Sequence, residues 1–358
     1  MSTNDKPLED KRVLVTGGTG SLGKVLVRRL LSGEMGVPKK VTVFSRDEAK
    51  QHFMRVSYET NKAVTDEVIY RNFLRTLVFR IGDVRDVESV ASALRDADIV
   101  INAAAMKQVP TCEYFPYEAV RTNIGGAENI VSAIQRYNLD IDTVIGVSTD
   151  KACKPVNVMG MTKAVQERVF IQGNMRCPGT RFVCVRYGNV LASRGSVIPL
   201  FHDQIRHGGP LTITTEDMTR FLLSLDDAVD TVFAAIRTGK RGETFIPRAP
   251  ASRIVDVAKA LIGDRDVNID VIGVRPGEKI HEVLISGEES TRVVSRGNWY
   301  ALKPMLPEIV DADEATIPMD SEYSSGTDVL DFEGTLKLLK ERKLMVDDVS
   351  LSDGELLR

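Results

Sequence analysis

Two short segments of this chain place side chains that can donate and accept protons close together. The first contains Thr149, Asp150 and Lys151, and the second begins eight residues later at Met159 and ends at Lys163. A neutral lysine can take a proton and a protonated aspartate can give one, so the pair suits general acid–base catalysis. We expect the pKa of Lys151 to be lowered by neighbouring positive charge and that of Asp150 to be raised by burial.

A glycine-rich turn between a predicted strand and a predicted helix could hold a pyrophosphate. Residues 16–23 read TGGTGSLG. Gly17 permits the tight turn, Gly20 lets the backbone approach the anion, and Gly23 allows the helix to pack closely with its N-terminus facing the anion. An ordinary glycine-rich turn is the plain alternative. The predicted cofactor contacts are Gly17, Thr19, Gly20, Ser21, Leu22 and Gly23.

The end of the second predicted strand favours NADP over NAD. Phe44 is followed by Ser45 and Arg46, where an acidic residue would grip an unmodified ribose. A hydroxyl and a guanidinium complement a 2'-phosphate. Asp47 and Glu48 follow at once, so Arg46 could instead be a solvated surface charge.

Small and acidic residues after the next two strands could line the same cofactor. Asp83 and Val84 are placed to meet the adenine, and Ala103 and Ala104 let the chain pass close to the cofactor. Small residues there could equally serve packing alone.

These segments need a parallel sheet to bring them together. Apolar runs recur with helical patterns between them, as βαβ units require. We therefore predict an α/β fold, a Rossmann-type doubly wound parallel sheet with a smaller C-terminal substrate-binding lobe. The predicted strands are 12–16, 41–44, 77–81, 98–103, 143–147 and 182–186, and the predicted helices are 113–137 and 159–172.

The alternation of predicted strands and helices ends at about residue 190, after which glycine and proline become frequent. We predict an NADP-binding domain over 10–190 and a substrate-binding lobe over 191–330, with sheet-completing segments exchanged between them. A charged helix and tail would occupy 331–358. Residues 61–76 exceed a usual connection and are predicted to be a helical insertion that contacts a partner.

Composition excludes several classes of protein. Apolar residues make up 43% of the 358 residues and charged residues 27%, as in ordinary globular proteins. A net charge of -3 argues against nucleic-acid binding. The four cysteines and four histidines lack metal-ligand spacing, so we expect free thiols and no metal. The polar N-terminus and the absence of a long apolar run predict a cytoplasmic protein without a membrane segment.

From about residue 10 to about 310 the chain resembles the extended short-chain dehydrogenase/reductase family. Within it the chain is most similar to the inverting UDP-N-acetylglucosamine 4,6-dehydratases, in a form without their frequent N-terminal membrane region. The resemblance rests on motifs in the family's order, namely TGGTGSLG, FSRDE, AAAMKQVP, TNIGGAENI, STDKACKPVN, RYGNVLASRGSVIP, MTRF and RPGEKIHE.

The resemblance implies roles for further residues. Asn123 would support the active-site geometry, Lys163 would bind the nicotinamide ribose, and Lys107 would lie between cofactor and substrate. Thr149, Asp150 and Lys151 would face the sugar. The diphosphate and nucleoside of a UDP-N-acetylhexosamine would be held by Asn189, Arg194, Arg275 and Glu278. Each has a plain alternative; Arg275, for instance, could simply pair with Glu278 within a turn.

The implied reaction removes water across C5 and C6 of the sugar. Oxidation at C4 makes a ketone that acidifies the C5 proton, which Lys151 takes while Asp150 protonates the departing C6 hydroxyl. The stored hydride then returns to C6. The implied product is a UDP-4-keto-6-deoxy-L-hexosamine for surface-glycan synthesis.

Met159 departs from the broad family, which has a proton-accepting tyrosine four residues before the active-site lysine. A thioether cannot accept and return a proton. Either the chain belongs to dehydratases that naturally carry methionine there, with the C4 hydroxyl proton leaving through Thr149, Asp150 or water, or catalysis has been lost. We expect the first, because Asp150, Lys151 and Lys163 remain together.

Two other functions stay open. A UDP-sugar 4-epimerase would also oxidise C4 but would return the hydride there, without needing Lys151 as a C5 base. A non-catalytic NADP-binding sensor would tolerate the loss of tyrosine. The resemblance also implies a homo-oligomer, either a dimer or a hexamer.

Overall fold

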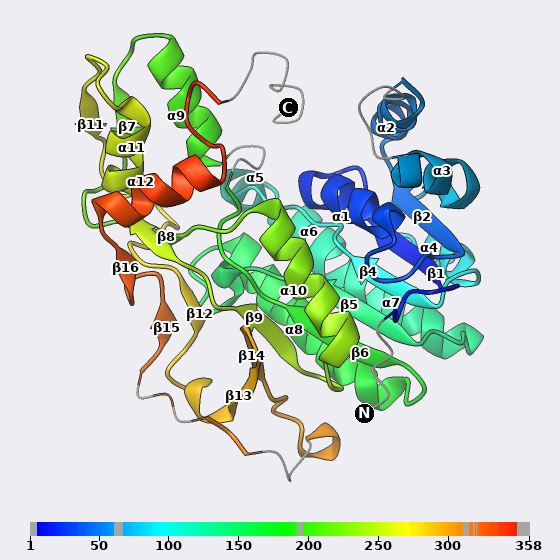
Figure 1. Ribbon diagram of the computed structural model, residues 1–358. Helices are drawn as coiled ribbons and strands as arrows, with labels where there is room; N and C mark the ends of the chain where they lie inside the picture. The colour runs from blue at the N-terminus through cyan, green and yellow to red at the C-terminus, as the bar shows by residue number, and fades with distance from the viewer. Residues whose placement is uncertain are drawn as a thin grey trace.

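One large sheet runs through the centre of the protein (Figure 1). The computed structural model describes residues 6–60, 67–191, 196–310, 315–317, 319 and 321–348. Within these ranges the sheet has nine strands, in the order β13-β14-β9-β6-β5-β4-β1-β2-β3. Their bounds are β1 Arg12–Thr16, β2 Lys40–Ser45, β3 Leu77–Ile81, β4 Ile99–Asn102, β5 Thr143–Val147, β6 Arg181–Val185, β9 Thr244–Pro247, β13 Val293–Arg296 and β14 Trp299–Leu302.

The sheet is parallel from β3 to β9 and antiparallel at the β14 and β13 edge. Strands β4 and β5 are buried at every residue, which explains their unbroken apolar sequence. The order β3-β2-β1-β4-β5-β6 is that of dinucleotide-binding sheets. The predicted α/β fold with a Rossmann-type sheet is therefore confirmed.

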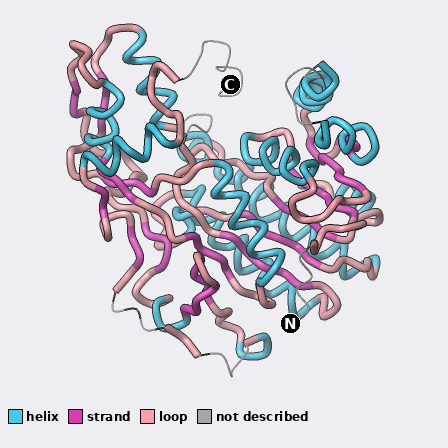
Figure 2. The backbone as a smooth tube through the Cα atoms, in the orientation of Figure 1, coloured by secondary structure: helices cyan, strands magenta, loops and turns pink. Residues whose placement is uncertain are grey.

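Helices cover both faces of the sheet, as Figure 2 shows. On one face, Leu26 and Leu30 of α1 join Val232 of α10 in one core cluster. On the other face, Ile130 of α7 and Phe170 of α8 join a second cluster. Helices α1 Ser21–Ser32, α3 Glu67–Thr76 and α10 Leu225–Thr238 lie on the first face, and α4 Val87–Leu94, α7 Gly125–Tyr137 and α8 Val158–Arg176 on the second.

The predicted helix 113–137 is wrong as a single element. The structure divides it into α5 Val109–Tyr114, α6 Pro116–Ala119, a π-helical turn Val120–Ile124 and α7. A proline has no N–H to continue the helical ladder, so the chain breaks at Phe115 and Pro116. The π turn carries Asn123, which becomes fully buried.

The predicted insertion at 61–76 is described from residue 67 onward, where it forms α3. Residues 61–66 lie outside the described ranges. Helix α2, Glu48–Thr60, precedes it and stands out beyond the sheet beside α3 (Figure 1). Contact between this insertion and a partner stays a prediction.

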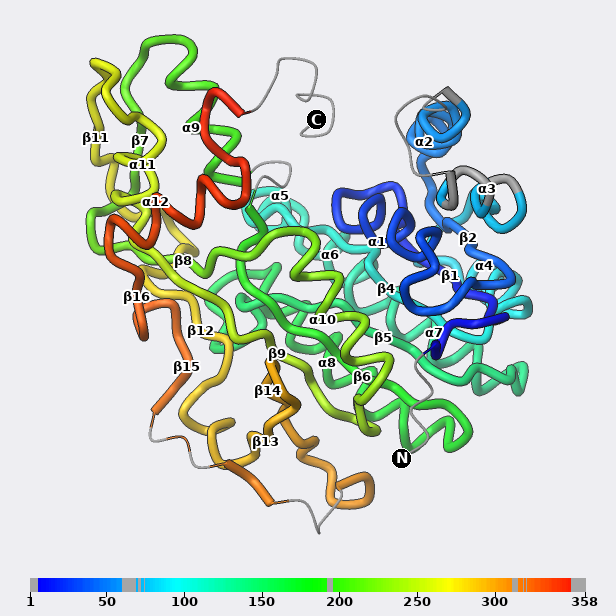
Figure 3. The backbone as a smooth tube through the Cα atoms, viewed as in Figure 1, coloured from blue at the N-terminus to red at the C-terminus, as the bar shows by residue number. Residues whose placement is uncertain are grey.

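The second half of the chain builds a smaller lobe around its own core cluster. Figure 3 shows the later strands β13 and β14, in orange, returning to the large sheet beside β9. The lobe's helices are α9 Val197–Arg206, α11 Ile254–Ile262 and α12 Phe332–Glu341. Its short strands are β7 Leu211–Ile213, β8 Thr219–Phe221, β10 Ala251–Arg253, β11 Ile269–Val271, β12 Val283–Ile285, β15 Tyr323–Ser324 and β16 Val329–Leu330.

Candidate active site

The glycine-rich turn joins the end of β1 to the start of α1. Gly17 has a φ of 66°, and a Cβ there would lie 2.8 Å from the Cα of Ala104. A Cβ on Gly23 would lie 2.5 Å from the Gly17 carbonyl oxygen. Gly20 is the N-cap of α1 and offers no side-chain cap to the first-turn N–H groups. These N–H groups are therefore available to an anion, as a phosphate-binding turn requires.

Strands β1 and β4 are tied together where they approach this turn. The Thr16 hydroxyl donates to Asn102 Oδ1 at 2.6 Å and accepts from the Ala104 N–H at 3.2 Å. The Ala103 N–H donates to the Thr16 carbonyl at 3.2 Å. Ala103 and Ala104 are therefore held beside Gly17, where larger side chains would fill the approach to the turn.

Ser45 and Arg46 lie at the end of β2, next to the same turn. The hydroxyls of Ser45 and Thr19 are 3.1 Å apart, which links β2 to the glycine-rich turn. Arg46 is exposed, with Asp47 and Asp83 within electrostatic reach. Asp83 itself is paired with Arg85 at 2.6 Å. The Arg46 guanidinium is thus placed beside the turn without an ion pair to another described residue.

Asp150 and Lys151 occupy a 3-10 turn, Asp150–Ala152, that begins three residues after the end of β5. The Asp150 N–H donates to the Tyr187 carbonyl at 3.0 Å, which fastens the turn to the chain after β6. The Lys151 amine donates to Asp150 Oδ1 at 3.1 Å, and the Thr149 hydroxyl donates to the same oxygen at 2.9 Å. The two predicted proton-transfer groups are therefore in direct contact at the carboxyl edge of the sheet.

Helix α8 begins against this turn. A Cβ on Gly160 would lie 2.2 Å from the Lys151 carbonyl oxygen, so the glycine lets the helix approach the turn. The Asn157 side chain caps α8 by accepting from the Gly160 N–H at 2.8 Å, and it donates to the Gly277 carbonyl at 2.9 Å. The start of α8 is thus joined both to the Lys151 turn and to the RPGEKIHE segment.

Glu282 is a site residue that the sequence reasoning missed. Its carboxylate lies 3.0 Å from the Lys151 amine, and the residue is 2% exposed. It is the last residue of the RPGEKIHE motif. Its acidic type inside that motif was the available signal, but no spacing along the chain connects it to Lys151.

The pKa values of the pair move in the same direction. Burial, aided by the nearby Glu282 carboxylate, raises the pKa of Asp150 despite the opposing Lys151 charge. This confirms the expected direction. Burial lowers the pKa of Lys151, but the Asp150 and Glu282 carboxylates outweigh it and the pKa lies above its ordinary value. In the chain alone the direction is the reverse of the expected lowering, because two carboxylates face one amine. The part of that expectation that rests on a cationic nicotinamide stays a prediction.

The predicted nucleotide-binding residues are only partly gathered here. Asn189 Oδ1 lies 3.4 Å from the Lys151 amine. Arg275 is exposed and its side chain does not pair with Glu278, which instead accepts from the Thr214 hydroxyl at 3.4 Å. Lys107 is exposed in the segment after β4. Arg194 lies outside the described residues.

Lys163 points from α8 to the end of β5. Its amine donates to the Val147 carbonyl and, at 2.6 Å, to Gln166 Oε1. Burial lowers its pKa to about 8. Lys163 therefore contacts Val147, the residue just before the Ser148–Lys151 segment. With a pKa of about 8, its amine can lose its proton near neutral pH.

We expect Lys163 to make stability depend on pH. Its folded pKa of about 8 lies below the unfolded value of roughly 10.4. The unfolded chain therefore binds more protons between these values, and the free energy of unfolding rises with pH across that window. From pH 7 to pH 10 the wild type should gain about 2 to 3 kcal/mol relative to Lys163→Met. Urea denaturation of both proteins at both pH values measures this, and an equal change in the two would contradict it.

Met159, in the first turn of α8, and Asn123, in the π turn, are both buried. Met159 is 5% exposed and packs with Cys112 and Ala119 in a small apolar cluster. The Asn123 amide accepts from the Met106 N–H at 2.8 Å and donates to Thr162 Oγ1 at 2.9 Å. Asn123 therefore links the chain after β4 to helix α8.

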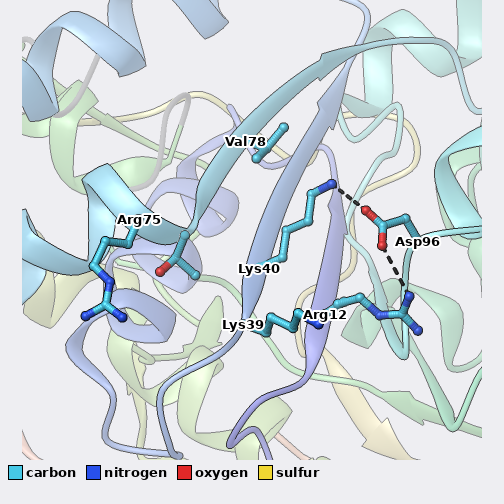
Figure 4. Close-up of a pocket in the computed structure, with 7 residues that line it drawn as sticks. Arg12, Lys39, Lys40, Arg75, Val78 and Asp96 are labelled. Carbon is cyan, nitrogen blue, oxygen red and sulfur yellow. Dashed lines mark hydrogen bonds and ion pairs between the residues drawn. The ribbon is translucent and has the colours of Figure 1, made fainter.

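A cavity of about 260 Å³ lies at the opposite edge of the sheet (Figure 4). There Arg12 and Lys40 both reach Asp96, at 3.2 and 2.5 Å, while Arg75 points away. This cavity is at the amino ends of the strands. Open α/β sheets bind their ligands at the carboxyl ends, so the cavity is not the candidate active site.

Two absences are observed in the described part of the chain. No helix there is long and apolar enough to cross a membrane. Within the same ranges, no group of three or more His, Cys, Asp or Glu side chains could hold a metal ion. The four cysteines are buried and free.

The sheet order, the glycine-rich turn after β1 and the lysine-bearing helix after β5 define the class. The chain has the Rossmann-type fold that is also found in solved nucleotide-sugar dehydratases and epimerases. Residues 13–304 match the family described as polysaccharide biosynthesis protein, and the chain belongs to this family.

Similar proteins carry more than one name. A UDP-glucose 4-epimerase of Rickettsia conorii is 46% identical over 298 residues, which are 82% of this chain and 83% of that protein. The structure of Pen from Bacillus thuringiensis is 32% identical with a TM-score of 0.83, covering 94% of this chain and 99% of that one. The dTDP-glucose 4,6-dehydratase DesIV from Streptomyces venezuelae, solved with NAD bound, is 22% identical with a TM-score of 0.63. The match covers 75% of this chain and 86% of the DesIV chain.

Proposed function

We propose that this chain is a UDP-N-acetylglucosamine 4,6-dehydratase that inverts C5 and yields a UDP-4-keto-6-deoxy-L-hexosamine. The observation that carries the proposal is the contact between the Asp150 carboxyl and the Lys151 amine at the carboxyl edge of the sheet. Elimination across C5 and C6 needs a base for one proton and an acid for the departing hydroxyl. Asp150 and Lys151 are two such groups on adjacent residues.

The side chains divide the work of elimination between them. Burial favours the neutral form of Asp150, which can protonate the C6 hydroxyl as it leaves as water. Lys151 loses its own proton to solvent before it takes the C5 proton from one face of the sugar, and a solvent-derived proton then reaches C5 from the opposite face, which inverts this centre. Asn189, which contacts Lys151, helps to orient the amine.

We propose NADP as the cofactor. The uncapped first turn of α1 would hold its pyrophosphate, and Ser45 and Arg46 would hold its 2'-phosphate. The cofactor would supply a hydride acceptor for C4 and a hydride donor for C6. Lys163 would bind the nicotinamide ribose and, with a pKa of about 8, could hold or release a proton beside it.

UDP-glucose 4-epimerase activity is the second candidate, and the names of the curated relatives favour it. An epimerase needs hydride transfer at C4 but no base at C5 and no acid at C6. Epimerisation therefore gives the Asp150 and Lys151 pair no proton transfer at C5 or C6 to perform. For that reason we place the dehydratase first.

Incubation with UDP-N-acetylglucosamine, followed by mass spectrometry, tests the proposal. A dehydratase loses one water, an epimerase leaves the mass unchanged but makes a new sugar, and a sensor changes nothing. With substrate deuterated at C4, the label should appear at C6, and in heavy water solvent deuterium should appear at C5. UDP-glucose in parallel tests the epimerase directly. A product of unchanged mass with a new C4 configuration would overturn the proposal.

Met159 should be replaceable without loss of function. Because it packs against Cys112 and Ala119 and supplies only shape, Met159→Leu should keep measurable turnover. Met161→Leu, at a half-exposed methionine on the same helix, is the matched control. If Met159→Leu loses as much activity as Lys163→Ala, the sulfur has a chemical role and the expectation fails.

A further inference from the structure

Glu282 contacts the Lys151 amine in addition to Asp150. It directly precedes β12, and its N–H donates to the Ser325 hydroxyl at 2.9 Å, which fixes its backbone. Its Oε1 lies 3.0 Å from the Lys151 amine and 3.9 Å from Arg220 Nε. The Lys151 amine is thus held between two carboxyl groups from distant parts of the chain.

Each carboxyl group keeps one buried oxygen without a hydrogen-bond partner among the described residues. These atoms are Asp150 Oδ2 and Glu282 Oε2. Two ionised carboxylates around one amine leave a net negative charge in a buried place, which is costly. When two carboxyl groups share one site, one of them takes a proton more readily. The structure therefore raises the question of which one is protonated.

The surrounding charges favour ionised Glu282. It has Arg220 and Lys279 nearby in addition to Lys151, whereas Asp150 has Lys151 and the Thr149 hydroxyl as its direct partners. Consistently, these cations lower the pKa of Glu282 against the effect of burial, while the pKa of Asp150 is raised.

We infer that Glu282 is a positioning residue that stays ionised, holds the Lys151 ammonium and places the shared proton on Asp150. This deepens the proposed function and rests on it for its catalytic meaning. Asp150 then acts as the acid because it carries the proton that the ionised Glu282 lacks. Lys151 begins the catalytic cycle as a charged ammonium group. The groups facing Lys151 are Asp150, Glu282, Arg220 and Lys279.

The first test measures Lys151 itself and needs no turnover. Competitive acetylation with acetic anhydride across pH, read by peptide mass spectrometry, reports the pH at which the amine becomes neutral. Glu282→Gln removes a charge 3.0 Å away and should move the Lys151 midpoint down by about one to three pH units. The exposed Lys337 serves as the internal reference. An unmoved midpoint would overturn the inference, whatever the enzyme catalyses.

The second test measures the pH profile of kcat/KM for water elimination. Because Glu282 raises the pKa of both Asp150 and Lys151, Glu282→Gln should move the whole profile to lower pH. Glu243→Gln, a buried carboxylate paired with Arg296 elsewhere, should leave the profile in place. A purely structural role would lower the rate without moving the profile, and that result would also overturn the inference.

A conservative variant covers the case in which Glu282→Gln does not fold. Glu282→Asp keeps the charge but withdraws it by one methylene, so both readouts should move in the same direction by a smaller amount. Wild-type protein without turnover on UDP-N-acetylglucosamine, but with the Lys151 midpoint shifted in the variants, would refute the proposed function and leave the role of Glu282 standing. An unshifted midpoint in Glu282→Asp as well would refute that role.

Discussion

Lys151→Ala should lower kcat/KM for water elimination by about a hundred- to ten-thousandfold, the usual contribution of a positioned acid–base group. The substitution removes the only proposed C5 base. NADP binding should persist, because the Lys151 amine contacts Asp150, Asn189 and Glu282 and not the glycine-rich turn. Mass spectrometry of the product and fluorescence titration of NADPH measure the two effects separately.

A nearby exposed lysine provides the control for that experiment. Lys154 lies three residues further on, is 46% exposed in its side chain and pairs with Glu322 at 2.6 Å. Lys154→Ala should leave elimination unchanged. A Lys151→Ala protein that still eliminates water at near wild-type rate, or a wild-type product with D configuration at C5, would refute Lys151 as the C5 base.

Arg46→Ala should weaken NADP binding about ten- to a hundredfold and leave NAD nearly untouched. A guanidinium–phosphate contact is worth roughly 1.5 to 3 kcal/mol, and about 1.4 kcal/mol is a factor of ten. Arg46 is exposed at the end of β2, beside the Ser45 hydroxyl that meets Thr19 of the glycine-rich turn. Titration of both cofactors, followed by protein or nicotinamide fluorescence, measures the ratio of dissociation constants.

The opposite end of the same strand offers a matched control. Lys39 is an exposed cation immediately before β2, whereas Arg46 immediately follows it. Lys39→Ala should change neither dissociation constant. Equal weakening of NADP and NAD by Arg46→Ala would mean that the arginine supports the fold of the turn and does not select the cofactor.

The cofactor end of the fold could be predicted from the sequence because its signals are local. The cofactor end is one continuous unit, namely strand β1, the glycine-rich turn and helix α1. Gly17 and Gly23 are needed there because a Cβ would collide with this unit or with the chain after the neighbouring parallel strand. Buried strands such as β4 and β5 can be recognised in the sequence as apolar runs. The adjacency of Asp150 and Lys151 is likewise a covalent fact.

Features that depend on distant contacts could not be predicted in this way. The π turn around Asn123 is one of them, because the Asn123 amide bonds to Met106 and to Thr162. The break at Pro116 has a local signal in the proline itself, which the prediction of one continuous helix overlooked. Strands β9, β13 and β14 complete the large sheet from the second half of the chain. The sequence predicts that such segments are exchanged but does not identify them, because β9 joins β6 and β14 joins β9 across long stretches of the chain.

The sequence by itself determined which groups can move protons and that they follow a strand of a parallel sheet. Only the tertiary structure decided their protonation. Glu282 arrives from 131 residues beyond Lys151 in the chain and brings a second carboxylate to the same amine. The balance between burial and these charges raises the pKa of Lys151, where the sequence alone suggested a lower one. A pKa depends on every charge within a few ångströms, and sequence order does not reveal which charges those are.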